Sequence, residues 1–203
     1  MYLITASLLN SWNYLFKVSE KYYDDAFENF VRSLKRERIE ANEYMIAGIQ
    51  FEDDCIAGKI NGISEIIKDG QYQVVVKEWV KIDNIDYLLY GRIDVLYKGV
   101  VYDIKRKWKY EVGSFLDSFQ HHLYMQCVPE AKKFEYLIGV KNSARKEEIT
   151  NDSFEIYYET YLREECREIN NDIREFVSWL KEKDLYEIYE KNWKAYKEVK
   201  KYV

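Results

Sequence analysis

The stretch GRIDVLYKGVVYDIKRK, residues 91–107, decides the fold expected for this chain. It contains two runs rich in β-branched and aromatic residues, joined by Lys98 and Gly99. A Lys-Gly pair in that position predicts a two-residue hairpin loop in which glycine supplies positive φ. The loop sets the register of the hairpin and places Tyr97 opposite Val100.

The same register places acid opposite acid and base opposite base, with Asp94 facing Asp103 and Arg92 facing Lys105. Directly opposed side chains have Cβ atoms only about 5 Å apart, so like charges there are destabilising. Because side chains alternate faces along a strand, the charged face is separate from an apolar face expected to pack in the core. That core face consists of Ile93, Val95, Tyr97, Val100, Tyr102 and Ile104.

These residues allow two interpretations of the charged face. In the first it is an ordinary solvated face, with diagonal salt bridges from Asp94 to Lys105 and from Arg92 to Asp103. In the second a divalent cation lies between the two carboxylates and relieves their repulsion. Oxygen-only ligation favours a hard ion such as Mg²⁺ or Mn²⁺.

Length and composition predict one globular domain. The chain has 203 residues, of which 47% are hydrophobic, enough to bury a sizeable core. There is no long apolar run that could span a bilayer, so we expect no membrane association. The opening MYLITASLLNSWNYLFK lacks the basic and apolar regions of a secretory signal, and we expect a cytoplasmic protein.

Cysteine and histidine usage argues against several kinds of site. The three cysteines, Cys55, Cys127 and Cys166, are widely separated and form no CxxC pair, which disfavours a disulfide framework or a zinc ribbon. The two histidines, His121 and His122, are adjacent, so they cannot both face one site from a helix. We expect the histidines to be structural.

Positive charge is concentrated around the two acids, although the chain as a whole has a net charge of −5. Residues 92–109 contain six basic and two acidic side chains. A basic island around paired acids is what a metal site that cuts phosphodiesters would need. The alternative is a solvated strand end. The candidates for nucleic-acid binding are Arg92, Arg106, Lys107 and Lys109.

The order of elements predicts an α/β fold with a central mixed sheet flanked by helices. Hydrophobic periodicity and turn signals give helices at 5–16, 20–38, 42–58 and 114–127, then charge-dense helix from 160 onward. Strands are expected at 72–81, 86–97, 100–105, 134–140 and 154–159. An aromatic stripe at helical spacing near the C-terminus predicts a packing face or a subunit contact, which leaves a homo-oligomer open. The stripe is Tyr186, Tyr189, Trp193 and Tyr196.

Four short motifs in order carry a family resemblance. Gly91 to Asp94 reads GxxD, Asp103 to Lys105 reads DxK, and Gln120 to Tyr124 reads QxxxY on the next helix. Upstream, Gly48 and Glu52 are four residues apart and share a helix face. With the opening ITASLLNSWNYLFK, this series resembles the RecB-like branch of the PD-(D/E)xK nuclease superfamily over residues 5–140.

The resemblance implies a PD-(D/E)xK restriction-endonuclease-like core, with 1–203 forming a single nuclease domain. Its expected parts are N-terminal helices at 1–60, a catalytic sheet with the QxxxY helix at 61–160 and C-terminal helices at 161–203. It implies Asp94, Asp103, the Ile104 carbonyl and Glu52 as ligands of Mg²⁺ or Mn²⁺, although Asp53 and Asp54 compete with Glu52. Lys105 would act on the attacking water or the transition state, and Gln120 and Tyr124 would hold DNA or brace the site.

The expected activity is therefore metal-dependent DNA hydrolysis, of the kind performed by stand-alone phage-type exonucleases in recombination or repair. Many relatives, including the CRISPR-adaptation exonucleases, carry an iron-sulfur cluster, but the cysteine pattern for one is missing here, so none is expected. Expected partners are DNA and a single-strand annealing or recombination protein. Two alternatives stay open: an inactive nuclease-fold binding module, and an endonuclease for branched DNA or RNA.

Overall fold

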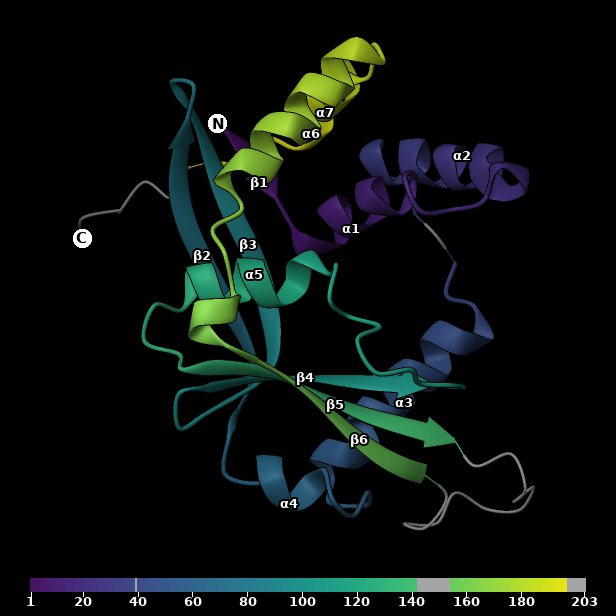
Figure 1. Ribbon diagram of the computed structural model, residues 1–203, viewed down its shortest axis with the longest axis vertical. Coiled ribbons are helices and arrows are strands. Elements are labelled where there is room, and N and C mark those ends of the chain that lie inside the picture. The colour runs from purple at the N-terminus through teal and green to yellow at the C-terminus, as the bar shows by residue number, and fades with distance from the viewer. Residues whose placement is uncertain (39, 142–153, 197–203) are drawn as a thin grey trace, which may run out of the picture.

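The computed structural model describes residues 1–38, 40–141 and 154–196. It contains a six-stranded mixed sheet flanked by helices, which confirms the predicted α/β class (Figure 1). The strands are β1 (Tyr2–Ile4), β2 (Gln71–Ile82), β3 (Ile85–Tyr97), β4 (Val100–Lys107), β5 (Lys133–Lys141) and β6 (Phe154–Leu162).

The helices surround the two ends of this sheet. In Figure 1 α1, α2, α6 and α7 lie around the upper part of the β2–β3 ribbon, whereas α3 and α4 lie beside the lower strands. The α-helices are α1 (Ala6–Tyr14), α2 (Tyr23–Leu34), α3 (Glu43–Ile56), α4 (Ser64–Ile67), α5 (Phe119–Cys127), α6 (Asn170–Glu182) and α7 (Tyr186–Asn192), and the 3₁₀ turns are η1 (Glu20–Tyr22) and η2 (Arg163–Glu165). None of the described helices is both long and apolar enough to cross a membrane.

Strand β3 is the centre of the sheet because it pairs with three other strands. It is antiparallel to β2 along nearly its whole length, parallel to β1 near its start, and antiparallel to β4 near its end. The sheet continues from β4 to β5 in parallel and from β5 to β6 in antiparallel fashion. The β1 pairing ends at Leu89 and the β4 pairing begins at Val95, so 90–94 have no strand partner on that edge of β3.

The hairpin of residues 91–107 has the predicted turn but only part of the predicted register. Lys98 and Gly99 both have positive φ, and Tyr97 pairs with Val100. The expected pairs of Asp94 with Asp103 and of Arg92 with Lys105 do not form. The ladder stops at Val95 and Tyr102, because the Ile104 amide donates to the Asp94 carboxylate (2.8 Å) rather than to a β3 carbonyl.

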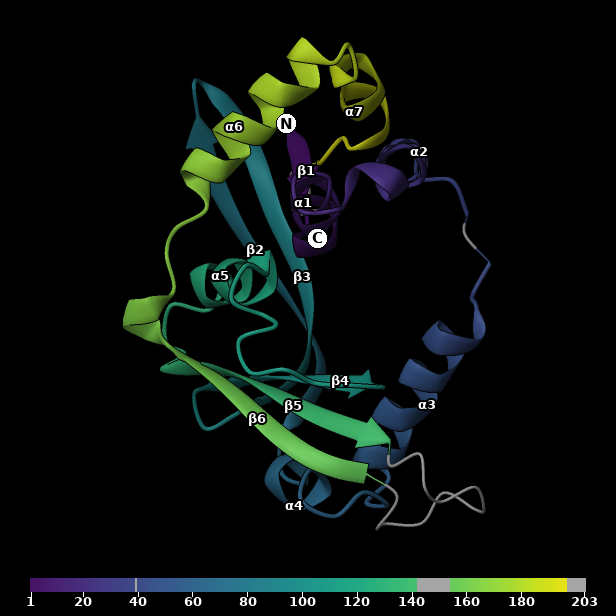
Figure 2. The same cartoon turned by 45° about the vertical axis from the view of Figure 1, so that its right-hand side comes forward.

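Helices cover both faces of the sheet, and on the charged face of the hairpin Asp103 is buried whereas Arg92 is exposed. A first apolar cluster packs α1, α2, α5 and α6 against one side and includes Val101, Leu123 and Phe176. A second, smaller cluster packs α3 and α4 against the β4–β5 side and includes Phe51 and Leu137. In Figure 2 α5 and α3 flank the fan of β4, β5 and β6. Asp103 lies between them with only 1% of its surface exposed.

Several element boundaries differ from the prediction. The region 1–60, expected to be helical, begins with the short parallel strand β1, whose three residues give too little alternation to signal a strand. The helix expected at 114–127 begins at Phe119, where the Ser118 side chain caps it. Region 161–203 begins with the last residues of β6 before η2 and α6.

The C-terminal aromatic stripe is mainly a packing face, as predicted. Tyr189 is fully buried, and Trp193 is buried and donates to the Leu34 carbonyl (2.9 Å). Tyr186 is partly buried against the same cluster. Tyr196 is 75% exposed and does not belong to the packing face, and for this residue a subunit contact stays a prediction.

Two glycines give a matched test of the packing between β3 and α5. A Cβ added at Gly91 would stand 2.1 Å from the Tyr124 ring, whereas a Cβ at Gly48 would meet nothing within 4 Å. We predict that Gly91→Ala lowers the free energy of unfolding by about 1–3 kcal/mol through overpacking. Gly48→Ala, in the interior of α3, should raise it by about 0.5–1 kcal/mol. Denaturant unfolding measures both, and equal stability of the two variants would show that Tyr124 does not pack on Gly91.

Candidate active site

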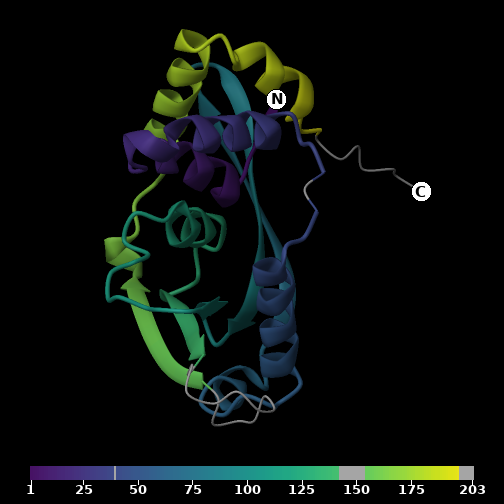
Figure 3. The same ribbon diagram turned by 90° about the vertical axis from the view of Figure 1, so that its right-hand side faces the viewer.

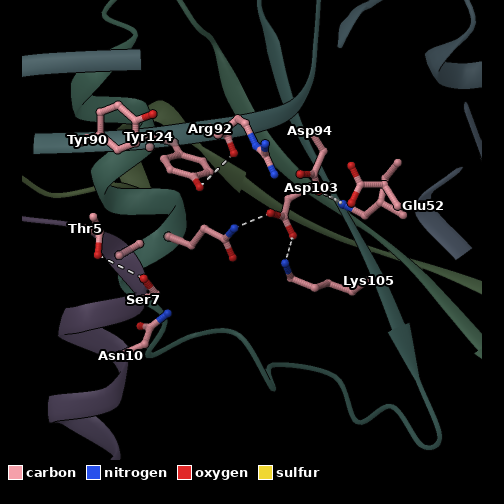
Figure 4. A pocket seen from close by; sticks show the side chains of 14 residues that line it. Thr5, Ser7, Asn10, Glu52, Tyr90, Arg92, Asp94, Asp103, Lys105 and Tyr124 are labelled. Carbon is pink, nitrogen blue, oxygen red and sulfur yellow. Dashed lines mark hydrogen bonds and ion pairs between the residues drawn. The ribbon is translucent and has the colours of Figure 1, made fainter. Parts of the chain in front are cut away.

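The edge of β3 that has no strand partner lines a cleft of about 480 Å³ (Figure 4). The separated strands β3 and β4 form its floor, and α1, α3 and α5 form its walls. Its lining residues are Thr5, Ala6, Ser7, Asn10, Glu52, Tyr90, Gly91, Arg92, Asp94, Asp103, Ile104, Lys105, Gln120 and Tyr124. Thus seven predicted catalytic or metal residues and Arg92, from four distant segments, lie in one cleft.

Asp103 is the most deeply buried charge of the cleft and has two partners within it. The Lys105 ammonium forms an ion pair with it, and the Gln120 side chain donates to its other oxygen. Burial raises the pKa of Asp103, against the opposing effect of Lys105 and Gln120. Burial lowers the pKa of Lys105, but the Asp103 and Asp94 carboxylates raise it more, so Lys105 is held as a cation. The diagonal bridge expected from Lys105 to Asp94 is therefore replaced by one to Asp103.

The ionisation of Asp94 is strongly perturbed. Burial and the neighbouring Asp103 raise its pKa to about 8, although Lys105 and the hydrogen bond from the Ile104 amide act in the opposite direction. At neutral pH the metal-free protein therefore keeps Asp94 largely protonated. A carboxyl group held neutral in this way ionises readily when a cation binds beside it.

Glu52 approaches the two aspartates from α3, on the other side of the strand gap. It lines the cleft, and burial and the nearby Asp103 raise its pKa. Its competitors point elsewhere: Asp54 is buried in an ion pair with Lys59 (2.9 Å), and Asp53 does not line the cleft.

Gln73 holds the Glu52 side chain and was not recognised from the sequence. Its amide donates to the Glu52 carboxylate. Its φ is +54°, a left-handed conformation that is uncommon for a residue other than glycine, and it stands across from Asp94 at a gap in the β2–β3 ladder. No sequence signal marks an isolated glutamine in a strand as having this conformation.

The donor set fits a divalent cation, provided that some contacts rearrange. Among the described residues, no three acidic, histidine or cysteine side chains converge closely enough to hold an ion as they stand. The Glu52 carboxylate accepts a hydrogen bond from Gln73, and the Asp103 carboxylate is paired with the Lys105 ammonium. The buried Oδ2 of Asp103 has the Lys105 ammonium as its partner, and a divalent cation would have to displace that ammonium to bind there. Two neighbouring carboxylates, of which Asp103 raises the pKa of Asp94, fit a hard cation.

Tyr124 and Gln120 belong to the same wall, as the QxxxY spacing predicts. The Tyr124 ring packs on Gly91, and its hydroxyl donates to the Arg92 carbonyl (3.2 Å), which lies on the unpaired edge of β3. The two side chains thus satisfy a free strand carbonyl and a buried carboxylate, and they fix α5 against the gap between the strands.

The N-terminus of α1 forms the wall next to α5 and supplies hydrogen-bonding groups that the motifs did not indicate. Thr5, Ser7 and Asn10 line the cleft there (Figure 4). The Thr5 hydroxyl accepts from the Leu8 amide as the helix cap (3.2 Å). Hydroxyl groups near a helix N-terminus provide a polar, electropositive surface that suits an anionic ligand.

Of the four predicted nucleic-acid-binding residues, the structure places one in the cleft and three outside it. Arg92 lines the cleft, and it forms no ion pair with any described residue. Arg106 and Lys107 lie at the end of β4, outside the cleft lining, and pack over the rings of Trp108 and Phe115, respectively (each at 5.1 Å). Lys109 is exposed and pairs with Glu111 (2.5 Å), so its charge is partly neutralised.

The histidines and cysteines lie outside the cleft. His121 is buried and stacks on Tyr161, with a centroid distance of 3.9 Å. Burial lowers the pKa of His121 to about 3 and that of His122 to about 4, so both rings are neutral at physiological pH. Burial also raises the pKa of the thiols of Cys55 and Cys127 to about 12.

Comparisons with known proteins show that this chain resembles some solved structures in overall fold only. No protein-family model matches the sequence, and no curated protein matches it significantly. Among solved structures, an alkaline exonuclease from Laribacter hongkongensis superposes with a TM-score of 0.47 at 12% identity, covering 93% of this chain and 92% of the other. The protein SSO0001 superposes with a TM-score of 0.47 at 13% identity, covering 88% of this chain and 77% of the other.

The raised pKa of Asp94 predicts how the stability of the metal-free protein depends on pH. Because the pKa rises from 3.8 to about 8 on folding, the folded state binds more protons between these values, and stability falls as pH rises through that interval. Asp94→Asn cannot ionise and keeps an acceptor for the Ile104 amide. In EDTA at pH 8 we predict a melting temperature several degrees above that of the native protein, with the difference closing toward pH 4.

Asp54→Asn is the matched control, since it removes a buried acid that pairs with Lys59 and should give no such gain. A lower melting temperature for Asp94→Asn at pH 8 would show that Asp94 stabilises the protein as an ion. Thermal unfolding by circular dichroism from pH 4 to pH 8 decides between these outcomes.

Proposed function

We propose that this chain is a nuclease that hydrolyses phosphodiester bonds in DNA with the help of Mg²⁺ or Mn²⁺. The observation that carries the proposal is the gathering of Asp94, Asp103 and Lys105 at the gap between β3 and β4, inside a cleft. Two acids and a cation are packed there although the Asp103 carboxylate raises the pKa of Asp94, an arrangement that costs stability. Groups with strongly perturbed pKa values gathered in a cleft are typical of a functional site.

Asp94 and Asp103 would hold the ion, joined by the Ile104 carbonyl and by Glu52 once it leaves Gln73. Few protein ligands are needed, because Mg²⁺ keeps several waters and takes phosphate oxygens of the substrate. When bound, such an ion polarises the phosphate and lowers the pKa of a coordinated water. Within the chain, Asp94 would be ionised in the metal-bound site, its proton having passed to solvent, and Gln120 would keep Asp103 oriented.

Lys105 is proposed to act on the reacting phosphate. In the metal-free state its ammonium is paired with Asp103. With Asp103 serving as a metal ligand, the Lys105 ammonium would be free at the floor of the cleft. There it can orient the attacking water or offset the negative charge of the transition state. Arg92 and the polar α1 wall, with Thr5, Ser7 and Asn10, lie around the same space and can contact neighbouring phosphates.

Cleavage assays with single-turnover kinetics test this assignment. The native protein should cut labelled DNA with Mg²⁺ or Mn²⁺ and not in EDTA, and cleavage of linear but not circular DNA would identify an exonuclease. Lys105→Ala should lower the single-turnover rate at saturating protein about 10²- to 10³-fold. Lys105→Gln, which keeps a donor beside Asp103, guards against a folding defect, because it should fold normally and still be slow.

Lys107→Ala is the matched control, because it removes a positive charge near the cleft without removing Lys105. It removes about one phosphate contact, so affinity and salt dependence should fall while the rate at saturating protein stays near normal. If Lys105→Ala and Lys105→Gln both cleave at the native rate, Lys105 is only a strand charge. A native protein that binds DNA but never cleaves it would favour the inactive binding module.

A further inference from the structure

We infer that Tyr44 and Trp108 form a stacking subsite for an unpaired base of the nucleic acid strand that enters the cleft. The inference rests on the proposed function and deepens it, since it assigns single-stranded character to the bound segment. Tyr44, at the start of α3, is 66% exposed, and Trp108, just after β4, is 58% exposed. Their rings meet edge to face with a centroid distance of 6.3 Å.

The position of this pair connects it to the active site. Tyr44, Gly48 and Glu52 are four residues apart along α3, so they share one side of the helix. Glu52 lines the cleft, and Tyr44 is eight residues away, about 12 Å along the axis. That length spans about three stacked nucleotides at roughly 3.4 Å each. In Figure 3 the first turn of α3 is the end directed toward α1 and α2.

Gly48 leaves the path between Tyr44 and Glu52 open. No neighbouring atom lies within 4 Å of the position that a Cβ would take there. Glycine in a helix interior costs about 0.5–1 kcal/mol relative to alanine, and no close packing in this protein accounts for it. Close approach of a ligand to the helix backbone accounts for it, as a strand passing along this side of α3 would require.

Charge favours nucleic acid over a protein partner at this place. The Arg106 guanidinium lies 5.1 Å from the centre of the Trp108 ring and forms no ion pair with any described residue. Lys107, the next residue, does not belong to this group, because its ammonium lies over the Phe115 ring. An aromatic pair beside an unpaired cation is the combination that binds single strands, because rings stack on bases while cations contact phosphates. An apolar contact with a protein partner would not explain the unpaired Arg106 beside the two rings.

Fluorescence anisotropy with two oligonucleotides in EDTA tests the subsite without cleavage. One is a 15-nucleotide dT strand, and the other is an abasic strand of the same length, which has the phosphates but no bases. The native protein should prefer dT. Trp108→Ala and Tyr44→Ala should each weaken dT binding about 5- to 150-fold and leave abasic binding unchanged. Trp108→Phe should keep most of the affinity, and Tyr22→Ala, an exposed tyrosine on η1, is the control.

Three results would overturn the inference. Unchanged dT affinity in both alanine variants, or equal losses on the two strands, would show that the rings do not stack on bases. A native dimer in sedimentation that Trp108→Ala dissociates would show that this face joins two copies of the chain. If the native protein cleaves DNA while the variants bind dT normally, only the subsite fails. If it neither binds nor cleaves DNA, the proposed function fails with it.

Discussion

The rest of the site depends on the separation of β3 from β4. At the point where they separate, the Ile104 amide of β4 donates a hydrogen bond to the Asp94 carboxylate of β3. A strand that leaves its neighbour exposes backbone groups that must find other partners. Here the Asp94 side chain takes one amide of β4, and the Tyr124 hydroxyl takes the Arg92 carbonyl of β3. The sheet therefore divides without leaving those groups unpaired, and the cleft lies where it divides.

The same separation explains how the fold tolerates buried charge. In a regular ladder the two aspartates would face each other directly and repel. With the strands apart, Lys105 reaches Asp103, and Asp94 remains protonated near neutral pH. The charges are balanced, but the arrangement is not the most stable one available, because replacing a buried ion pair with well-packed apolar residues is often neutral or stabilising. A binding role for the acids accounts for their presence better than stability does.

Much of this site could be predicted from short-range patterns. The Lys98-Gly99 turn fixed the hairpin, alternation along its strands placed Asp103 and Lys105 on one side, and helical spacing placed Gln120 with Tyr124. Each of these depends on a few residues that are close in sequence. Helical spacing likewise predicts a packing face or a subunit contact for Tyr189 and Trp193, and both are buried in the core.

Other features could not be predicted because they depend on contacts between distant segments. The end of the β3–β4 ladder at Val95 results from a side chain that replaces a backbone acceptor. The left-handed conformation of Gln73 is explained only by its contact with Glu52. Strand β1 depends on backbone pairing with β3 and with residues 193–195, all of them distant in sequence. Lys109 appeared to belong to the basic island, yet Glu111 pairs with it two residues away.

The central claim is that Asp94 and Asp103 together bind a divalent cation at the gap between the strands. Isothermal titration of Mn²⁺ into the native protein and into Asp103→Asn, each shown to be folded, tests it most directly. The account predicts saturable binding to the native protein, with release of a proton near pH 7, because Asp94 ionises when the ion binds. Asp103→Asn should lose most of that affinity. Equal Mn²⁺ affinity in the two proteins, or none in the native protein, would contradict the account.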